Sequence, residues 1–305
     1  MKEKLLGSIE AGGTKFVVAV ADFDFNVKEL TQFPTTTPEE TLAKVVNFFK
    51  QFEVASIGIG SFGPVDVTVE SKTYGHVLNT PKADWSGFDF LGTLKVAFDI
   101  PMYFTTDVNS SAYGEYTKGS ARGANSVVYF TLGTGVGGGA LQNGQFISGI
   151  AHAEMGHATV IAHPEDTYAG DCPFHSNHCF EGLAAGPTLE GRTGIKGEKL
   201  PRDHKVFNFI SYYAGQIAFN TFVNMAPEKI VFGGSVLQES DMPKVREYFK
   251  QFNNGYVVTP DLEELIVRPS IENNGSATIG NFGLALKELK EKEGSHSLPS
   301  GFITN

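Results

Sequence analysis

The sequence predicts an α/β protein of two domains, and three observations support this prediction. The chain has 305 residues, which at about 150 residues per domain suggests two domains or one large α/β unit. Strand-like apolar runs alternate with segments of helical spacing. A strand, a glycine-rich turn and a second strand occur near residue 12 and again near residue 133. From this weak repeat we expect a small domain at residues 1–117 and a large one at residues 118–276.

The first part of the chain alternates predicted strands with predicted helices. The strands are expected at residues 7–9, 16–21, 27–33, 54–60 and 99–105. Pro38 marks the start of a helix that keeps apolar residues at helical spacing as far as Phe49. The fifth strand delivers Thr106 and Asp107 at its carboxyl end, and a helix is expected from residue 110 to residue 118.

The second part of the chain begins with the most strand-like segment of the sequence. The predicted strands are residues 127–132, 140–142 and 229–232, and the predicted long helix starts at residue 206. Asn143-Gly144 is a type I′ turn signal. Residues 151–199 are expected to form mostly loop. A last helix, about residues 277–293, has an apolar stripe that needs a partner, so we expect it to pack back on the first domain.

Composition and charge exclude several classes of protein. Lysine and arginine number 24 and aspartate and glutamate 34, so the net charge of −10 disfavours a binder of nucleic acid or of an anionic membrane surface. The chain is 41% apolar and 19% charged, which suits a packed core. The apolar stretch before Glu10 is too short for a signal peptide, and glycines and amides interrupt the uncharged run 123–153. We therefore expect a cytoplasmic protein.

Two glycine turns are candidate phosphate-binding sites. Their residues are Gly12-Gly13-Thr14-Lys15 and Gly133-Thr134-Gly135. Glycine lets the backbone approach a ligand closely, and turn amides with hydroxyls bind phosphate oxygens. Either turn alone is more easily explained as an ordinary hairpin, but the pair favours a nucleotide clamped between two domains.

Two other nucleotide-binding motifs are disfavoured. Gly133-x-Gly135-x-x-Gly138 matches the dinucleotide fingerprint, but that fingerprint opens a helix, and the glycine-rich residues 137–139 do not suit one. Glu154 follows at about the right distance but lies in a predicted loop. The sequence contains no Gly-x-x-x-x-Gly-Lys-Ser/Thr loop.

Carboxylates, histidines and cysteines suggest a catalytic base and a metal site. Asp107, at a strand end, is placed to accept a proton, or Asp107 or Asn109 caps the following helix. The candidate metal ligands between residues 152 and 179 are His152, Glu154, His157, Cys172, His175, His178 and Cys179. Two thiolates and two imidazoles would hold a structural Zn²⁺, and three histidines compete for the two places. The alternative is an exposed loop with a reduced, inert thiol pair. Glu154 and Glu181 suit sugar hydroxyls, although most glutamates are surface residues.

Together these segments resemble the ROK family of sugar kinases, and within it the bacterial fructokinases. The segments that carry the resemblance are Ser8 to Phe16, Thr80-Pro81-Lys82 with Trp85, Thr106 to Asn109, Leu132 to Gly139, Glu154-Met155-Gly156-His157, Cys172 to Glu181 and Phe232 to Ser235. They run through nearly the whole chain. Jointly they are highly specific.

The resemblance implies an actin-like ATPase (ribonuclease H-like) fold whose two α/β domains close over ATP, Mg²⁺ and a hexose. It implies Asp107 as the catalytic base, sugar contacts from Asp107, Glu154, His157 and Glu181, and a homodimer. It implies a zinc loop at residues 157–181 with His157, Cys172, His175 and Cys179 as ligands, His178 being the alternative to His175. The expected nucleotide-binding residues are Gly12, Gly13, Thr14, Lys15, Thr131, Gly133, Thr134, Gly135, Pro187, Gly233, Gly234 and Ser235.

This sequence departs from the family pattern at three places. Glu10 stands where the first motif usually has aspartate, and it could still reach Mg²⁺, directly or through water. Thr106 stands where many relatives have asparagine, and a histidine replaces one cysteine of the zinc loop. The family's transcriptional repressors carry a helix-turn-helix domain before the first motif, for which the residues ahead of Ser8 leave no room.

The reaction predicted is ATP-dependent phosphorylation of D-fructose to fructose 6-phosphate. Residues 80–82 and the Cys-Pro-Phe-His form of the zinc loop favour fructose, by resemblance only. One alternative is a kinase acting mainly on mannose, glucose or an N-acetylhexosamine. The second alternative is a sugar-binding sensor without catalytic activity.

Overall fold

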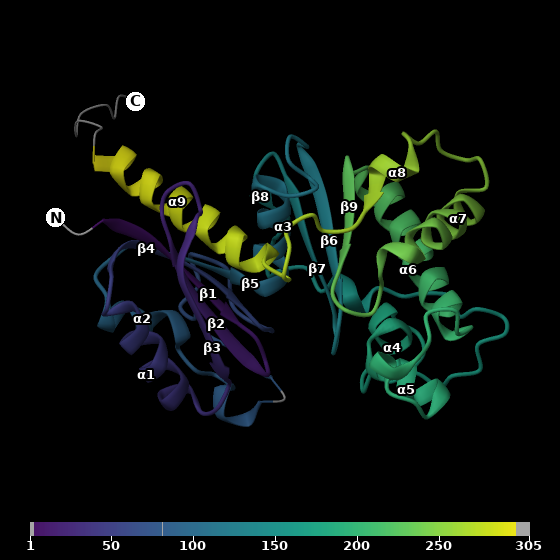
Figure 1. Cartoon of the computed structure of the whole chain (residues 1–305), viewed down its shortest axis with the longest axis horizontal. Helices are drawn as coiled ribbons and strands as arrows, with labels where there is room; N and C mark the ends of the chain where they lie inside the picture. The colour runs from purple at the N-terminus through teal and green to yellow at the C-terminus, as the bar shows by residue number, and fades with distance from the viewer. Residues whose placement is uncertain (1–2, 81, 297–305) are drawn as a thin grey trace. The chain divides into compact units, whose positions relative to one another are not determined.

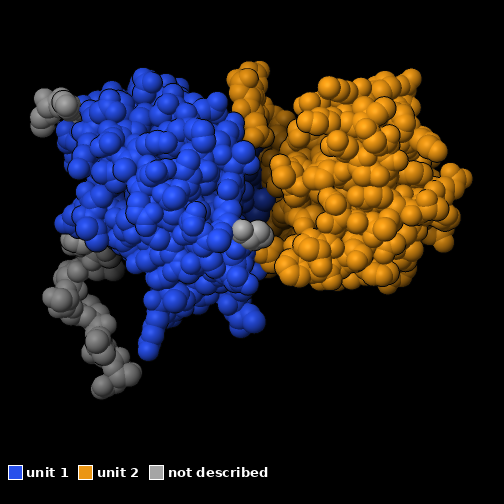
Figure 2. Space-filling model, turned by 90° about the horizontal axis from the view of Figure 1, so that it is seen from below, with its two compact units in different colours: residues 1–114, 149–152, 275–305 blue, residues 115–148, 153–274 orange. Residues whose placement is uncertain are grey.

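The computed structural model describes residues 3–80 and 82–296, and its chain divides into two compact units (Figures 1 and 2). Unit 1 comprises residues 1–114, 149–152 and 275–305, and unit 2 comprises residues 115–148 and 153–274. Each unit contains one five-stranded sheet. None of the helices within the described ranges has the length and apolar composition of a membrane span.

Unit 1 is built on a mixed sheet in the order β3-β2-β1-β4-β5. Its strands are β1 (Lys4–Ala11), β2 (Lys15–Ala21), β3 (Val27–Pro34), β4 (Glu53–Ser61) and β5 (Met102–Thr106). Its helices are α1 (Pro38–Phe49), η1 (Ala83–Trp85), α2 (Phe90–Ala97), the greater part of α3 (Asp107–Thr117) and α9 (Ser276–His296). Strand β1 pairs antiparallel with β2 and parallel with β4, so the β1–β2 turn lies at the carboxyl end of the parallel strands.

Alternate residues of β1 pack against different helices, because successive side chains of a strand point to opposite faces of the sheet. Leu5 and Ile9 belong to a cluster with residues of α1 and α2. Leu6 packs instead with Phe282 and Ala285 of α9. Figure 1 shows α9 running along the face of the sheet away from α1 and α2. Glu10 is therefore on the α9 face of the sheet.

Glycines allow α9 to approach α3 at backbone distance. A Cβ on Gly280 would lie 1.8 Å from the carbonyl oxygen of Ser110, and one on Gly114 would lie 1.9 Å from that of Ser276. The Ser110 hydroxyl donates to Asn281 Oδ1 at 2.6 Å, and Asn281 Nδ2 donates to the carbonyl of Ile9 at 2.9 Å. The last described helix is thus fixed to both α3 and β1.

Unit 2 is built on a sheet in the order β10-β9-β6-β7-β8. Its strands are β6 (Ser126–Leu132), β7 (Val136–Gln142), β8 (Gln145–Phe146), β9 (Lys229–Gly233) and β10 (Ile266–Val267). Its helices are η2 (Met155–His157), α4 (Phe180–Ala184), α5 (Pro187–Thr193), η3 (Gly197–Lys199), α6 (Val206–Met225), η4 (Glu239–Asp241), α7 (Met242–Asn253) and α8 (Leu262–Leu265). Phe130 and Phe232 stack on neighbouring strands, 5.5 Å between ring centroids, inside the core that α6 covers.

A buried glutamate holds the chain where it enters unit 2. Glu115 is fully buried, and its Oε2 accepts hydrogen bonds from the amides of Ser120 and Ser270 at 2.7 and 3.1 Å. The Ile271 amide donates to Oε1 at 3.4 Å. One carboxylate therefore joins the entry segment of unit 2 to residues near its exit at residue 274.

The structure confirms the strands predicted for β1 to β4, β6 and β9 and the helices predicted for α1, α6 and α9. Helix α3 begins at Asp107 and not at residue 110, because the Thr106 hydroxyl accepts the Asn109 amide at 3.1 Å and so caps it. Strand β5 begins three residues later than expected, at Met102. Strand β7 begins at Val136 rather than at residue 140, because its glycines already pair with β6 from Val136 opposite Leu132 onward.

Several helices of the structure were not predicted from the sequence. Helices α2, α7 and α8 lie in segments for which no element was predicted, and α4 and α5 lie in the stretch predicted as mostly loop. The last two are short and lie among glycines and prolines, which masks helical spacing.

From the close contact between α3 and α9 we predict how two substitutions in α9 change stability. Gly280→Ala should lower the free energy of unfolding by about 1–3 kcal/mol, because the new methyl group would overlap a backbone carbonyl of α3. Gly294→Ala, in the same helix, should leave it unchanged or raise it by up to about 1 kcal/mol, since no described atom lies within 4 Å of a Cβ there. Urea unfolding measures both, and equal effects would contradict the packing argument.

Candidate functional site

Hydrogen bonds within the β1–β2 turn of unit 1, and from Thr35 to the turn, fix its conformation. The Gly12 amide donates to the carbonyl of Lys15 at 2.9 Å, and the Thr35 hydroxyl donates to the carbonyl of Gly12 at 2.7 Å. The Thr35 amide donates to the carbonyl of Thr14 at 3.0 Å. Among the described residues, the amides of Gly13 and Thr14 have no hydrogen-bond acceptor. These two amides are the donors that an anion at the turn would use.

Two lysines lie near this turn, and only one of them was expected to bind the nucleotide. Lys15 was predicted to bind the nucleotide, but its Nζ donates to Gln32 Oε1 at 2.9 Å on the neighbouring strand. Lys82 was expected only as part of the segment that favours fructose, not as a nucleotide-binding residue, and its Cε lies 3.4 Å from the position of a Cβ on Gly13. The buried Trp85 fixes the segment of Lys82, since its Nε1 donates to the carbonyl of Thr36 at 2.8 Å. Pro81, which the resemblance also singled out, is outside the described residues.

Two carboxylates of unit 1, those of Glu10 and Asp107, interact electrostatically. Asp107 is the first residue of α3, and its Oδ1 accepts the Val108 amide at 2.8 Å. Burial, and next the charge of Asp107, raise the pKa of the Glu10 carboxyl to about 7, while Lys15 and the Thr278 hydroxyl act in the opposite direction. A divalent cation beside Glu10 would offset both of the effects that raise its pKa.

The β6–β7 turn of unit 2 is tied to Glu181. The Gly133 amide donates to the carbonyl of Gly135 at 2.9 Å, and the Gly186 amide donates to the carbonyl of Gly133 at 2.7 Å. Glu181 Oε2 accepts the amide of Val136 at 3.0 Å. The second predicted phosphate turn is therefore connected directly to a carboxylate predicted to bind sugar.

Four side chains of the predicted zinc loop converge. Ligand atoms of His157, Cys172, His175 and Cys179 all lie within 4.8 Å of one another. His157 Nδ1 is 3.8 Å from Cys172 Sγ and 3.9 Å from Cys179 Sγ, and His175 Nδ1 is 3.6 Å from Cys172 Sγ. A tetrahedral Zn²⁺ with ordinary bond lengths would separate sulfur and nitrogen ligands by roughly 3.6 Å. The donor set and its spacing therefore fit such an ion.

The surroundings of the Cys179 thiol disfavour its charged form when no cation is bound, as the direction of its pKa shift shows. Both cysteines are free and buried. Burial raises the pKa of the Cys179 thiol to about 11, and Cys172 acts in the same direction. A bound cation would reverse this effect, because a metal-bound thiol is deprotonated.

The remaining residues of the His-rich stretch lie elsewhere. His152 belongs to unit 1, where its Nε2 accepts the Val65 amide at 3.3 Å. His178 is not in the four-residue group, although its backbone bonds with Val160 and His175 hold the loop. Glu154 is exposed immediately before η2. A Cβ on Gly156 would meet the carbonyl of Val136 at 1.8 Å, so η2 packs tightly on β7.

His157 presents its two ring nitrogens to different groups. Its Nδ1 faces the sulfur atoms, whereas its Nε2 lies 3.9 Å from Glu181 Oε1. One imidazole can therefore serve a metal through Nδ1 and a polar ligand through Nε2.

A cavity of about 700 Å³ in unit 2 brings together part of the predicted nucleotide set. Gly133, Thr134, Pro187 and Ser235 line it, but Thr131, Gly135, Gly233 and Gly234 do not. A Cβ on Gly233 would meet the Tyr129 hydroxyl at 1.9 Å, and one on Gly234 would meet the Leu132 carbonyl at 2.2 Å. Internal packing thus accounts for glycine at positions 233 and 234.

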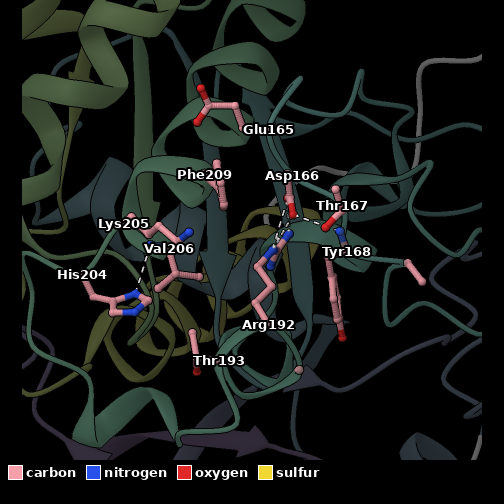
Figure 3. Close-up of a pocket in the computed structure, with 12 residues that line it drawn as sticks. Glu165, Asp166, Thr167, Tyr168, Arg192, Thr193, His204, Lys205, Val206 and Phe209 are labelled. Atoms are coloured by element: carbon pink, nitrogen blue, oxygen red, sulfur yellow. Dashed lines mark hydrogen bonds and ion pairs between the residues drawn. The ribbon is translucent and has the colours of Figure 1, made fainter.

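A second cavity, of about 320 Å³, contains none of the predicted site residues (Figure 3). On its wall Asp166 binds Arg192, 2.8 Å between Oδ2 and Nη2, and accepts the Tyr213 hydroxyl at 2.7 Å. Arg192 also donates to the carbonyl of Leu183 at 2.8 Å. This buried ion pair fastens the segment between η2 and the cysteines to α4, α5 and α6.

Comparison with known proteins adds independent information. The family model named ROK family matches residues 6–288. A fructokinase of Streptococcus mutans serotype c is 52% identical over 290 residues, which cover 93% of this chain and 98% of that protein. A fructokinase of Lactococcus lactis subsp. cremoris is 50% identical over 282 residues, which cover 92% and 96%.

A solved structure agrees with the fold. The ROK hexokinase from Thermus thermophilus superposes with a TM-score of 0.75 and 21% sequence identity, covering 94% of this chain and 99% of that one. At this level of identity the likeness concerns the fold.

The four-residue group predicts which histidine holds a metal. Purified protein should contain about one zinc ion per chain, and Cys172→Ser, Cys179→Ser and His175→Ala should each lose it, because each removes one of the convergent donors. The matched control His178→Ala should retain it. Elemental analysis of each purified variant measures this, and retention by His175→Ala with loss by His178→Ala would contradict the geometry.

Proposed function

Because this chain belongs to the ROK family, we propose that it is a fructokinase, which transfers the γ-phosphoryl group of ATP to the 6-hydroxyl of D-fructose. It is an ATP-dependent hexose kinase with the actin-like ATPase fold, here containing two five-stranded sheets. The observation that carries the choice of fructose is the identity of about one half with fructokinases along almost the whole chain.

Asp107 is the residue we assign as base. The sugar oxygen attacks the γ-phosphorus, the bond from that phosphorus to the ADP oxygen breaks, and the hydroxyl proton passes to the Asp107 carboxylate. The Val108 amide orients that carboxylate by binding Oδ1, and the first turn of α3 fixes its position. Phosphoryl transfer requires alignment and neutralised charge more than covalent chemistry, so one placed base is sufficient.

The β1–β2 turn supplies donors for the transferred phosphate. The amides of Gly13 and Thr14 are available to phosphate oxygens, and we assign the neutralising cation to Lys82 in place of Lys15. We propose that the turn at Gly133 and Thr134 holds the remaining phosphates. Glu10 is the carboxylate that would hold Mg²⁺, which supplies further neutralising charge when bound.

The second unit supplies the sugar contacts that we propose. His157 Nε2, Glu181 and Glu154 are a donor and two acceptors suited to hexose hydroxyls. Zinc would hold His157, Cys172, His175 and Cys179 together and give the loop its order, a structural role. The homodimer and the cytoplasmic location stay predictions from the sequence and its resemblance.

One experiment tests the function directly. ADP release should be measured with MgATP against fructose, mannose, glucose, N-acetylglucosamine and N-acetylmannosamine, for wild type and Asp107→Asn. We expect the fastest turnover with fructose, and a fall of at least about 1,000-fold in the variant because the proton has no acceptor. Faster turnover of another sugar would contradict the fructose assignment. Sugar binding without turnover of any of them would indicate a sensor.

The two lysines at the first turn provide a matched pair. Lys82→Gln should lower kcat by about 100-fold, because the transferred phosphoryl group loses a cation. Lys15→Gln should change kcat by less than about threefold, because an exposed lysine bound to a glutamine on a neighbouring strand contributes little. Steady-state rates at saturating fructose measure both. The reverse order of effects would contradict the assignment to Lys82 and support the nucleotide role predicted for Lys15.

A further inference from the structure

Arg202 lies on the wall of the 700 Å³ cavity in unit 2, at a position that neither the sequence motifs nor the resemblance marks. The residues that line the cavity with it include Gly133 and Thr134 of the β6–β7 turn, Pro187, Ser235 and Gln238. Its volume is within the range of about 300–1,000 Å³ that is usual for small-molecule sites.

Three contacts fix the guanidinium group of Arg202. Its Cζ lies 3.7 Å from the ring centroid of Phe207, which is van der Waals distance for stacked planes. Its Nη1 donates to the carbonyl of Val236 at 3.1 Å, and its Nη2 forms an ion pair with Asp241. Asp241 in turn accepts the amide of Gln238 at 2.7 Å. The plane of the guanidinium is therefore set before any ligand binds.

The orientation leaves one face of this plane for the cavity. Phe207 is almost fully buried and covers one face, whereas the Arg202 side chain keeps 28% of its surface exposed. Nε of Arg202 is buried and has no hydrogen-bond partner among the described residues, so the exposed surface of this side chain belongs to its other atoms. A planar, weakly hydrated cation with one free face is suited to stack on an aromatic ring of a ligand.

We propose that Arg202 stacks on the base of the bound nucleotide and makes the site prefer purine over pyrimidine nucleotides. The proposal rests on the proposed function, because it takes the cavity as the nucleotide site. The phosphate turn at Gly133 and Thr134 holds one end of the nucleotide, and the base extends along the cavity to Arg202. A purine covers more of the guanidinium plane than a pyrimidine, so the contact separates the two classes without distinguishing adenine from guanine.

Direct binding separates this role from a structural one. Calorimetric titration of the whole protein with MgADP, MgUDP and Mg-tripolyphosphate should be carried out for wild type, Arg202→Lys and Arg246→Lys. Arg202→Lys retains the charge near Asp241 but loses the plane. Arg246 is the matched control, because its side chain donates to the carbonyl of Ile266 away from the cavity.

We expect Arg202→Lys to weaken MgADP binding by about 5- to 160-fold, the range measured for base–aromatic stacking. The loss for MgUDP should be smaller, and tripolyphosphate, which has no base, should bind as before. In turnover assays KM for ATP should rise while KM for fructose stays constant. Arg246→Lys should change none of the binding ratios. An equal loss for all three ligands, or no loss for MgADP, would overturn the proposal.

A measurement on the wild-type protein covers the case in which Arg202→Lys does not fold. A photoreactive azidoadenine diphosphate should label the segment around residues 197–210, and excess ADP should prevent the labelling. Labelling confined to another segment would overturn the proposal.

If the protein phosphorylates a different sugar while the MgADP effect of Arg202→Lys remains, only the fructose assignment fails. If wild type binds no nucleotide, both conclusions fail.

Discussion

The short segment from Cys179 to Glu181 links three parts of the candidate site in unit 2. Cys179 is one of the four convergent metal-binding side chains, and its Sγ also accepts the amide of Gly182 at 3.4 Å, which caps α4. Glu181 lies in the first turn of that helix and reaches both the Val136 amide and His157. A single structural unit therefore aligns the metal ligands, the sugar carboxylate and the second phosphate turn. The loop from η2 to α4 has few core residues, so its position depends on these polar links and on the Asp166–Arg192 pair.

Much of the fold could be predicted because strands and amphipathic helices leave local periodic patterns. The patterns at β1, β2, β6, α1 and α6 lie within a few residues of the observed bounds. The position of Lys82 near the Gly13 turn could not be predicted in this way, because it brings together distant segments through the packing of Trp85. The sequence also could not decide between His175 and His178 as metal ligand. Both lie at plausible spacing, and only the three-dimensional course of the loop separates them. Helices α4 and α5 escaped prediction because they are too short to show a period.

Glycine is present in the predicted site for two different physical reasons, and a sequence motif does not show which reason applies at a given position. At Gly133 no described atom lies within 4 Å of a Cβ, so nothing in the chain requires glycine there and the space is open to a ligand. At Gly233 and Gly234 a side chain would overlap Tyr129 or the backbone of β6. Arg268 adds a further internal constraint by donating to the carbonyl of Gly234 at 3.1 Å. A glycine-rich segment is thus an argument for a ligand only where the chain itself leaves the space unfilled.

The return of α9 to the first sheet affects how the chain folds during synthesis. Leu6, Ala19 and Ala21 are covered by Phe282 and Ala285, which leave the ribosome only after all of unit 2 has been made. At about 5–20 residues per second, this apolar face of the nascent sheet remains uncovered for roughly ten seconds or longer. Unit 2 is contiguous apart from residues 149–152 and is fully synthesised by residue 274, so the amino-terminal sheet receives its covering helix last, and its open apolar face is prone to aggregation until then.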